Sequence, residues 1–339
     1  MKYKLPSPVQ IYGAKNILSN LLTLQQEMGG VRKPDDIEFI HQMRVASRRL
    51  RSAIEVFGPI IAPKKHIVWL SETKQLTKAL GAARDQDVQI EFLKDFVHEL
   101  PDEKYRPGIK RLIVRLMQKR QKSQESVALA IENINQSGVI VEMISKLSPA
   151  ANLQMNQYNT PDTYLLAEES IMQRMDQLLS YESYIFDPKN IEQLHAMRIA
   201  AKHLRYTMEI FQTIYAEEIN PYLQVTKKIQ EGLGNIHDCD MWEQFLNTFR
   251  IKERQKIVRF YGYAKPINRL NPGLDYFQSN RQIERERLYN QFIQDWEEWK
   301  AQSIWLQMKE MLHSHCIPEE KLLPFEISSE EDSQFNQSA

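Results

Sequence analysis

Residues 41–57, HQMRVASRRLRSAIEVF, decide the fold, because the same pattern returns at residues 195–211 as HAMRIAAKHLRYTMEIF. Eight of the seventeen positions are identical, and equivalent residues are separated by 154 positions. A second match follows in the same order: LGAARDQD at residues 80–87 returns as LGNIHDCD at residues 233–240, at a separation of 153. Two ordered matches at nearly one separation indicate an internal duplication, and they predict two related halves with pseudo-two-fold symmetry.

Both copies of the longer motif have the periodicity of an amphipathic α-helix, about 100° per residue. One side of each copy is apolar, and we expect it to face the core: Met43, Ala46, Leu50, Ala53, Ile54 and Phe57 in the first, and Met197, Ala200, Leu204, Thr207, Met208 and Phe211 in the second. The opposite side carries cations about one helical turn apart. These two basic rows are His41, Arg44, Arg48 and Arg51, and His195, Arg198, Lys202 and Arg205.

Helical periodicity continues along the rest of the chain, and glycine and proline are sparse, with 11 and 15 among 339 residues. The sequence therefore predicts an all-α fold. We expect one domain over residues 7–315, with halves at about 7–150 and 160–315, followed by an acidic, disordered tail at 316–339. The predicted helices cover 7–28, 35–60, 64–83, 86–98, 103–134, 138–147, 161–181, 188–216, 219–236, 239–250, 274–300 and 303–315.

Cysteine content and hydropathy limit the classes of protein to which the chain can belong. The two cysteines, Cys239 and Cys316, exclude a disulfide framework and fit a reducing compartment. The sequence has no run of about 18 apolar residues and no apolar leader at its start. We therefore expect a cytoplasmic protein that has no membrane partner.

The basic rows suit an external anion. Cations in a row repel each other. The acids on the same side of each helix, Glu55 and Glu209, lie only at the end of the row. We expect them to orient Arg51 and Arg205. Arginine offers forked donors to phosphate oxygens, and a bound polyanion would raise the pKa of a histidine beside it. A single basic stripe is usually an ordinary solvated surface, but its duplication in the same register favours binding.

Further cations accompany the rows. Lys74 and Lys78 share a helix side with Gly81, and a glycine there permits close approach of an anion or of a neighbouring helix. The second copy keeps Lys227 but has Glu231 where Lys78 stands, so we expect the first half to bind more tightly. Secondary candidates are Arg49 and His203, which lie off the rows, and Arg115 and Lys119, which belong to a third stripe with Arg111 and Lys122.

The acidic residues of the second motif allow a metal interpretation, in which Asp85, Asp87, Asp238 and Asp240 act as ligands. Residues two apart on a helix do not share a face, so we favour a structural role, with Asp85 and Asp238 capping a helix or pairing with arginines of the rows. The sequence has no phosphate-binding glycine loop, GxSxG or HExxH pattern. We therefore expect no catalytic residues, no metal site, no cofactor and no enzymatic activity.

The His-x-x-Arg-x-x-x-Arg-Arg-Leu-Arg pattern, its second copy and the Leu-Gly-x-x-Arg/His-Asp-x-Asp elements resemble the CHAD family, the conserved histidine α-helical domain. The resemblance covers about residues 7–315. It implies two antiparallel helical bundles around a basic central channel that binds inorganic polyphosphate. The implied ligands are the eight residues of the basic rows, followed by Lys74 and Lys227. The Glu-x-Glu-x-Lys pattern of the associated CYTH domain is absent, which favours a stand-alone binding module.

The leading hypothesis is therefore non-enzymatic binding of inorganic polyphosphate, with association with polyphosphate granules as a further expectation. One alternative is a metal-dependent enzyme or accessory factor that acts on phosphate compounds. A second is nucleic-acid binding through the same face, which a net charge of zero, from 44 basic and 44 acidic residues, disfavours. A weaker hypothesis is that the acidic tail folds over the basic face.

Overall fold

The computed structural model describes residues 6–30, 37–154 and 158–316, and within these ranges the chain is helical and forms no strand. The first half contains α1 (Pro8–Met28), α2 (Ile37–Val56), α3 (Pro63–His98), α4 (Arg106–Gln136) and α5 (Val139–Ala151). The second half contains α6 (Pro161–Leu179), α7 (Ile191–Tyr215), α8 (Asn220–Tyr261), α9 (Asn271–Ala301) and α10 (Ile304–Ser314). The predicted all-α fold is confirmed. The predicted tail lies outside the described residues, apart from Cys316.

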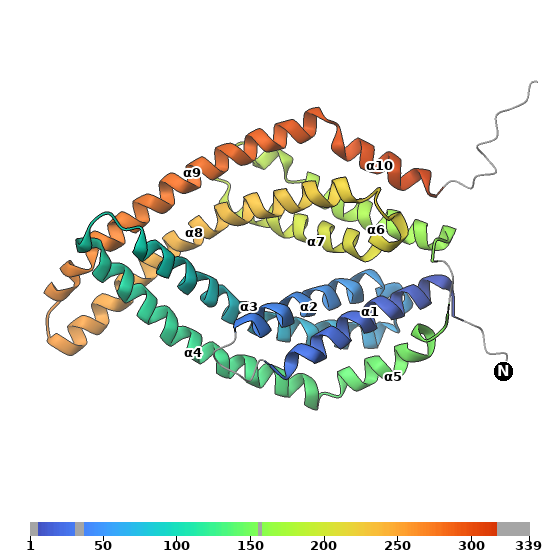
Figure 1. The fold of residues 1–339 in the computed structure, drawn as a ribbon, viewed down its shortest axis with the longest axis horizontal. Helices are drawn as coiled ribbons and strands as arrows, with labels where there is room; N and C mark the ends of the chain where they lie inside the picture. Colours follow the sequence, from blue (N-terminus) through green and yellow to red (C-terminus); the bar gives the residue numbers. More distant parts are fainter. Residues whose placement is uncertain (1–5, 31–36, 155–157, 317–339) are drawn as a thin grey trace, which may run out of the picture.

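The two halves have the same order of packing. In each half the first four helices pack in sequence, and the fifth returns to the first (α1 with α5, α6 with α10). Figure 1 shows α1–α5 along one side of the molecule and α6–α10 along the other. The halves meet through equivalent helices: α1 contacts α6, α2 contacts α7, and α4 contacts α9. This is the pattern of contacts that the predicted two-fold arrangement requires, although exact symmetry stays a prediction.

Two apolar clusters hold the halves together. The larger includes the predicted core face of both motif copies, which is buried as expected. In this cluster the equivalent residues Phe57 and Phe211 lie with ring centroids 6.1 Å apart, and Tyr12 packs on both rings. The smaller cluster lies where the ends of α3 and α4 meet α8 and α9, around Phe277, which packs on Phe96 and Trp242 at centroid distances of 5.0 and 5.1 Å.

Several helix boundaries differ from the sequence prediction, among them the end of α8, which lies at Tyr261 and not at residue 250. The expected breaks near residues 84–85 and 237–238 do not occur, because α3 and α8 run through them as single helices. The expected capping role of Asp85 and Asp238 is therefore wrong, since both lie inside helices. The second half's long motif helix begins at Ile191 instead of Pro188, because the Asp187 side chain accepts a hydrogen bond from the Lys189 backbone N–H at 2.9 Å in a preceding turn.

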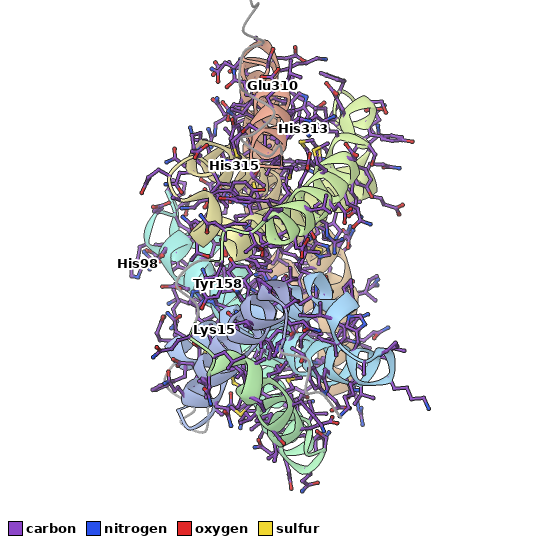
Figure 2. The ribbon with its side chains drawn as sticks, turned by 90° about the vertical axis from the view of Figure 1, so that its right-hand side faces the viewer. Lys15, His98, Tyr158, Glu310, His313 and His315 are labelled. Carbon is purple, nitrogen blue, oxygen red and sulfur yellow. The ribbon has the colours of Figure 1, made fainter. Side chains whose placement is uncertain are left out.

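The connection between the halves is anchored on α1. The Tyr158 ring lies 5.4 Å from the ring of Tyr12, and the Lys15 ammonium group both bonds to the Tyr158 hydroxyl and lies 5.1 Å from its ring centre. Figure 2 shows Lys15 and Tyr158 adjacent, with His313 of α10 and His315, which follows α10, on the other side of the junction. None of the described helices combines the length and the apolar character needed to cross a lipid bilayer.

Candidate functional site

The two basic rows face each other across the contact between α2 and α7. The Arg48 guanidinium of the first half lies 5.1 Å from the ring centre of Tyr206 in the second half. Arg205 approaches the same ring at 5.0 Å. Because the electron-rich face of an aromatic ring attracts cations, Tyr206 holds one arginine from each half beside it. The structure thus brings together two rows that the sequence places 154 residues apart.

Six cations of the rows form one electrostatic group, called here the cationic cluster: Arg44, Arg48, Arg51, Arg198, Lys202 and Arg205. Burial lowers the pKa of Arg48 to about 10, and the nearby guanidinium groups of Arg44, Arg205 and Arg198 contribute. Burial also lowers the pKa of Lys202 to about 7, and arginines of both halves add to the shift. Arg48 and Lys202 are equivalent residues of the repeat, so each half contributes one half-buried cation whose charge is disfavoured by its surroundings.

Two glutamates orient the last arginine of each row, as the sequence predicted. Arg51 Nε lies 3.5 Å from Glu55 Oε1, and Arg205 Nε lies 3.6 Å from Glu209 Oε1. Each glutamate is shared with an arginine outside the rows. Arg174 lies 3.4 Å from Glu55, and Arg49 lies 3.3 Å from Glu209. The carboxylates therefore neutralise only part of the positive charge around the cationic cluster.

Burial lowers the pKa values of three histidines of the second half, His195, His203 and His237, and so favours their neutral form. The rings of His195 and His237 pack with centroids 4.0 Å apart. Burial lowers the pKa of His195, with a further contribution from Arg198, and lowers the pKa of His237 to about 4. His203, a secondary candidate, lies beside Lys202, and burial lowers its pKa to about 4. In the first half, His41 is partly exposed, and Arg84 occupies the sequence position equivalent to His237.

The second motif positions the first arginine of each row. A Cβ atom on Gly81 would lie 3.7 Å from Arg44 Nε, and one on Gly234 would lie 3.4 Å from Arg198 Nε. Each guanidinium group therefore lies over a glycine, at a distance where a Cβ atom would make an ordinary van der Waals contact. Asp85 adds an ion pair to Arg44 at 3.5 Å, which confirms the predicted pairing with the first row.

The other aspartates of this motif lock neighbouring helices together. Asp87 on α3 accepts a hydrogen bond from Arg120 Nε on α4 at 2.6 Å, and the equivalent Asp240 on α8 binds Arg285 on α9. Both carboxylates are buried. Across residues 6–30, 37–154 and 158–316, no group of three or more His, Cys, Asp or Glu side chains is arranged to hold a metal ion. The contacts support the structural interpretation for Asp85, Asp87 and Asp240, whereas the pairing of Asp238 with a row arginine stays a prediction.

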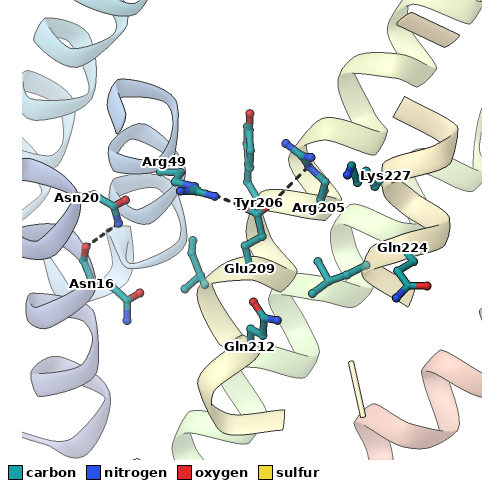
Figure 3. Close-up of a pocket in the computed structure, with 11 residues that line it drawn as sticks. Asn16, Asn20, Arg49, Arg205, Tyr206, Glu209, Gln212, Gln224 and Lys227 are labelled. Atoms are coloured by element: carbon teal, nitrogen blue, oxygen red, sulfur yellow. Dashed lines mark hydrogen bonds and ion pairs between the residues drawn. The ribbon is translucent and has the colours of Figure 1, made fainter. Parts of the chain in front are cut away.

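The lysines differ between the halves. Lys74 and Lys78 are exposed, whereas Lys227 Nζ lies 3.8 Å from Glu231 Oε1. Lys227 also lines an open pocket of about 340 Å³ with Arg49, Arg205 and Glu209, and Asn16 and Asn20 of α1 form its opposite wall. Figure 3 shows Glu209 between the two arginines of this pocket. The unequal lysine environment agrees with the expectation that the halves contribute unequally.

The third basic stripe is largely occupied by an internal ion pair. Arg111 and Arg115 of α4 bind Glu253 of α8 at 2.5 and 2.7 Å, and that carboxylate is only 2% exposed. Burial of an unpaired glutamate would be costly, so these arginines stabilise the contact between the halves. Lys119 of the same stripe is exposed. Arg115 therefore has a structural task that its position in a basic stripe did not indicate.

Two residues near the cationic cluster escaped the sequence analysis. Tyr206 lies inside the repeated motif, but the first copy has Ser52 at the equivalent position, so the repeat gave no reason to select it. Arg174 comes from α6, outside both motifs, and reaches Glu55 of the other half. Both act through contacts between the halves, which no local sequence pattern reveals.

A helical protein with a repeated half and a cationic cluster between the repeats defines a recognisable class. The chain matches the CHAD domain family over residues 17–247, and it belongs to that family. It is 25% identical over 212 residues to uncharacterized proteins from two strains of Mycobacterium tuberculosis. The match covers 61% of this chain but only 39% of the length of those relatives.

Two solved structures share the fold. The crystal structure of the CHAD domain from the plant Ricinus communis superposes with a TM-score of 0.58 at 22% identity, over 81% of this chain and 91% of that chain. PptA from Streptomyces chartreusis superposes with a TM-score of 0.55 at 12% identity, over 86% of this chain and 100% of that chain. At these identities the likeness establishes the fold and leaves the ligand to be argued from the site.

Proposed function

We propose that the chain binds inorganic polyphosphate, or a polyanion of similar charge density, without catalysing a reaction on it. The carrying observation is the meeting of Arg48 and Lys202, equivalent residues whose pKa values are both lowered by burial and by cations of the two halves. Like charges held this closely destabilise the unliganded protein. A phosphate chain would relieve that repulsion and accept charge-assisted hydrogen bonds from the guanidinium groups.

The arrangement of apolar and polar contacts supports a ligand between the halves. The halves pack through one apolar cluster around Phe57 and Phe211 and another around Phe277. The cationic cluster consists of the polar residues of α2 and α7, on the sides of these helices opposite their core faces. A channel for the polyanion along this polar stretch is part of the proposal. Lys74, Lys78 and Lys227 would extend it on α3 and α8, and His41 and His195 would donate additional hydrogen bonds.

A titration with a long, defined polyphosphate tests the proposal. We expect saturable binding whose affinity falls steeply with salt, because neutralising a dense anion releases counterions. Changing Arg44, Arg48, Arg198 and Lys202 together to Glu should abolish binding, since four attractions become repulsions. A matched variant, Lys64→Glu with Lys146→Glu, reverses two exposed cations elsewhere and should bind like the unmodified protein. Absence of saturable binding at moderate salt would refute the proposal.

The enzymatic alternative requires a separate measurement. Asp87 and Asp240 are bound by arginines, which leaves these carboxylates unsuited to hold a divalent ion. We therefore expect no release of phosphate from polyphosphate or nucleotides when Mg²⁺, Mn²⁺ or Zn²⁺ is added. Sustained release that requires the metal would replace binding by catalysis as the function. The cytoplasmic, granule-associated location belongs to the same proposal, and imaging beside a polyphosphate stain would test it.

A further inference from the structure

The second half contains a segment that the first half lacks. Asp87 and Gly108 are 21 residues apart, whereas their equivalents Asp240 and Gly273 are 33 residues apart. The equivalence holds on both sides of the difference, because Asp87 binds Arg120 as Asp240 binds Arg285, and both glycines occupy the third position of their helices. The second half therefore has twelve additional residues, which extend α8 and add the 3-10 helix η4 (Lys265–Arg269).

This added segment is strongly basic. Residues 250–269, called here the basic tip, contain seven arginines and lysines and one acid, Glu253. Glu253 is buried and bound by Arg111 and Arg115, so it does not offset the surface charge. Six of the cations are exposed and form no ion pair within the described chain: Lys252, Arg254, Lys256, Arg259, Lys265 and Arg269. The tip projects at the end of the molecule where α8 turns into α9 (Figure 1).

Exposed aromatic rings accompany the charge. Phe260 is 81% exposed, and Tyr261 and Tyr263 are 53% and 56% exposed. Gly262, with a φ of +80°, ends α8 in a left-handed conformation and separates the two tyrosines. The ring centroids of Phe260 and Tyr261 are 4.8 Å apart. The first half connects α3 to α4 without the added segment, through a turn that contains Glu99, Asp102 and Glu103 in place of aromatic residues. The connection between α8 and α9 therefore does not need these exposed rings in order to fold.

A pocket within the basic tip combines three kinds of side chain. It has a volume of about 530 Å³ and lies between α8 and η4. Its lining includes the cations Arg254 and Lys265, the apolar Ile251 and Ile267, and the amides of Asn268 and Asn271. Cations suit phosphate, apolar walls suit a base, and amides can hydrogen-bond to base edges.

The basic tip is separate from the cationic cluster. Between His237 and Arg250 the same helix carries Asp238, Asp240 and Glu243 and no lysine or arginine. The apolar cluster around Phe277 also lies at this end of the molecule. A phosphate chain along α8 would therefore meet the exposed carboxylates of Asp238 and Glu243 before it reached the tip, and the tip constitutes an independent surface.

We propose that the basic tip binds single-stranded nucleic acid, with the unpaired cations on the phosphates and Phe260 and Tyr263 as stacking surfaces for bases. The net charge of zero disfavours nucleic acid as a partner for the whole chain. That net charge is an average over the basic tip and acidic regions elsewhere, so it does not describe the tip. An anionic membrane would also attract the cations. The pocket amides favour nucleic acid, because an asparagine side chain can both donate to and accept from the edge of a base.

Fluorescence anisotropy with labelled twelve-nucleotide oligo-U and oligo-dT tests this with the full chain. We expect saturable binding of both strands, weaker binding of a twelve-base-pair duplex, and at least tenfold weaker binding after Lys256→Glu with Arg259→Glu. In that variant the slope of log affinity against log salt concentration should become less steep by about 1.4, since two phosphate contacts are lost. Phe260→Ala with Tyr263→Ala keeps the charge and should weaken binding at least about thirtyfold, because two stacking contacts are lost.

Controls make the outcome decisive. Lys64→Glu with Lys146→Glu matches the charge change of the first tip variant and should leave oligonucleotide affinity unchanged. The variant in which four residues of the cationic cluster are changed to Glu should also keep its affinity for the oligonucleotide. The proposal for the tip and the proposal for polyphosphate can therefore fail separately. Any of three results would overturn the proposal. The tip variants would bind the oligonucleotide as tightly as the unmodified protein, or the matched control would lose as much affinity as the tip variant, or the duplex would bind as tightly as the single strand. Tip-dependent binding to anionic phosphatidylserine vesicles without oligonucleotide binding would assign the tip to a membrane instead.

Discussion

Gly108 and Gly273 pack directly against each other where the equivalent helices α4 and α9 cross. A Cβ atom on Gly108 would lie 2.4 Å from the Leu270 carbonyl oxygen and 3.3 Å from the Gly273 carbonyl carbon. One on Gly273 would lie 2.0 Å from the Tyr105 carbonyl oxygen. Both obstacles are backbone atoms, so the helices can approach this closely only because neither residue has a side chain.

Replacing Gly273 with alanine should therefore push α9 away from α4. We expect a loss of about 1–3 kcal/mol in the free energy of unfolding, the usual cost of overpacking a tight contact. Denaturant unfolding followed by circular dichroism would measure it. Gly29→Ala is the matched control, because its new Cβ atom meets nothing within 4 Å and the backbone is already right-handed. A smaller loss for Gly273→Ala than for Gly29→Ala would contradict the close contact.

The aspartates of the second motif should differ sharply in their effect on stability. Asp240→Ala leaves Arg285 partly buried without its carboxylate and should cost about 3–5 kcal/mol, as breaking a buried ion pair does. Asp85→Ala removes an ion pair at 3.5 Å from a carboxylate that is 67% exposed, and should cost at most about 1 kcal/mol. Thermal or urea unfolding of both variants would compare them. Equal losses would argue against the structural role of Asp240.

Polyphosphate affinity should depend on pH through Lys202. Its pKa of about 7 lies below its ordinary value of 10.5, so the folded, unliganded protein loses this charge as the pH rises through 7. A bound polyanion favours the charged amine, and binding above pH 7 must therefore take up a proton. We expect affinity to fall as the pH rises above 7, by at most about tenfold per pH unit from this one group.

Calorimetry in two buffers of different ionisation enthalpy would measure the proton uptake. Lys202→Arg is the informative control, because the equivalent Arg48 shows that the fold accepts arginine in this position and arginine stays charged. That variant should bind with little pH dependence between pH 7 and 9. The same linkage predicts that the unliganded protein gains stability between pH 7 and 10.5, as the unfavourable charge on Lys202 is lost. An unchanged pH profile in Lys202→Arg would remove Lys202 from the site.

The inequality of the halves can be reduced by one substitution. Glu231→Lys restores the cation that the first half has at Lys78 and frees Lys227 from its pair at 3.8 Å. We expect tighter polyphosphate binding and a steeper salt dependence, because more cations are available to the anion. Glu125→Lys on α4 makes the same charge change at another exposed position. A similar gain in both variants would show that only the net charge matters.

The sequence by itself determined the helical class, the duplication and the two basic rows. These follow from periodicity and from residue identity within single helices, which depend on local backbone geometry. It also offered two roles for Asp85, capping a helix or pairing with an arginine of the rows, and the structure decided for the pairing. The prediction of separate helices around residues 84 and 237 failed, because the neighbouring helices satisfy the polar residues there through Arg44, Arg120 and Arg285.

Only the tertiary structure decided that the rows face each other. The placement of Arg48 on Tyr206 depends on how α2 packs against α7, which no periodicity within either helix specifies. The third basic stripe shows the same limit, because Arg115 looked like a binding residue until the fold placed buried Glu253 against it. Long-range electrostatics arises between elements that are remote along the chain. The sequence therefore supplied the charges, and the packing of the two halves decided which of them remain for a ligand.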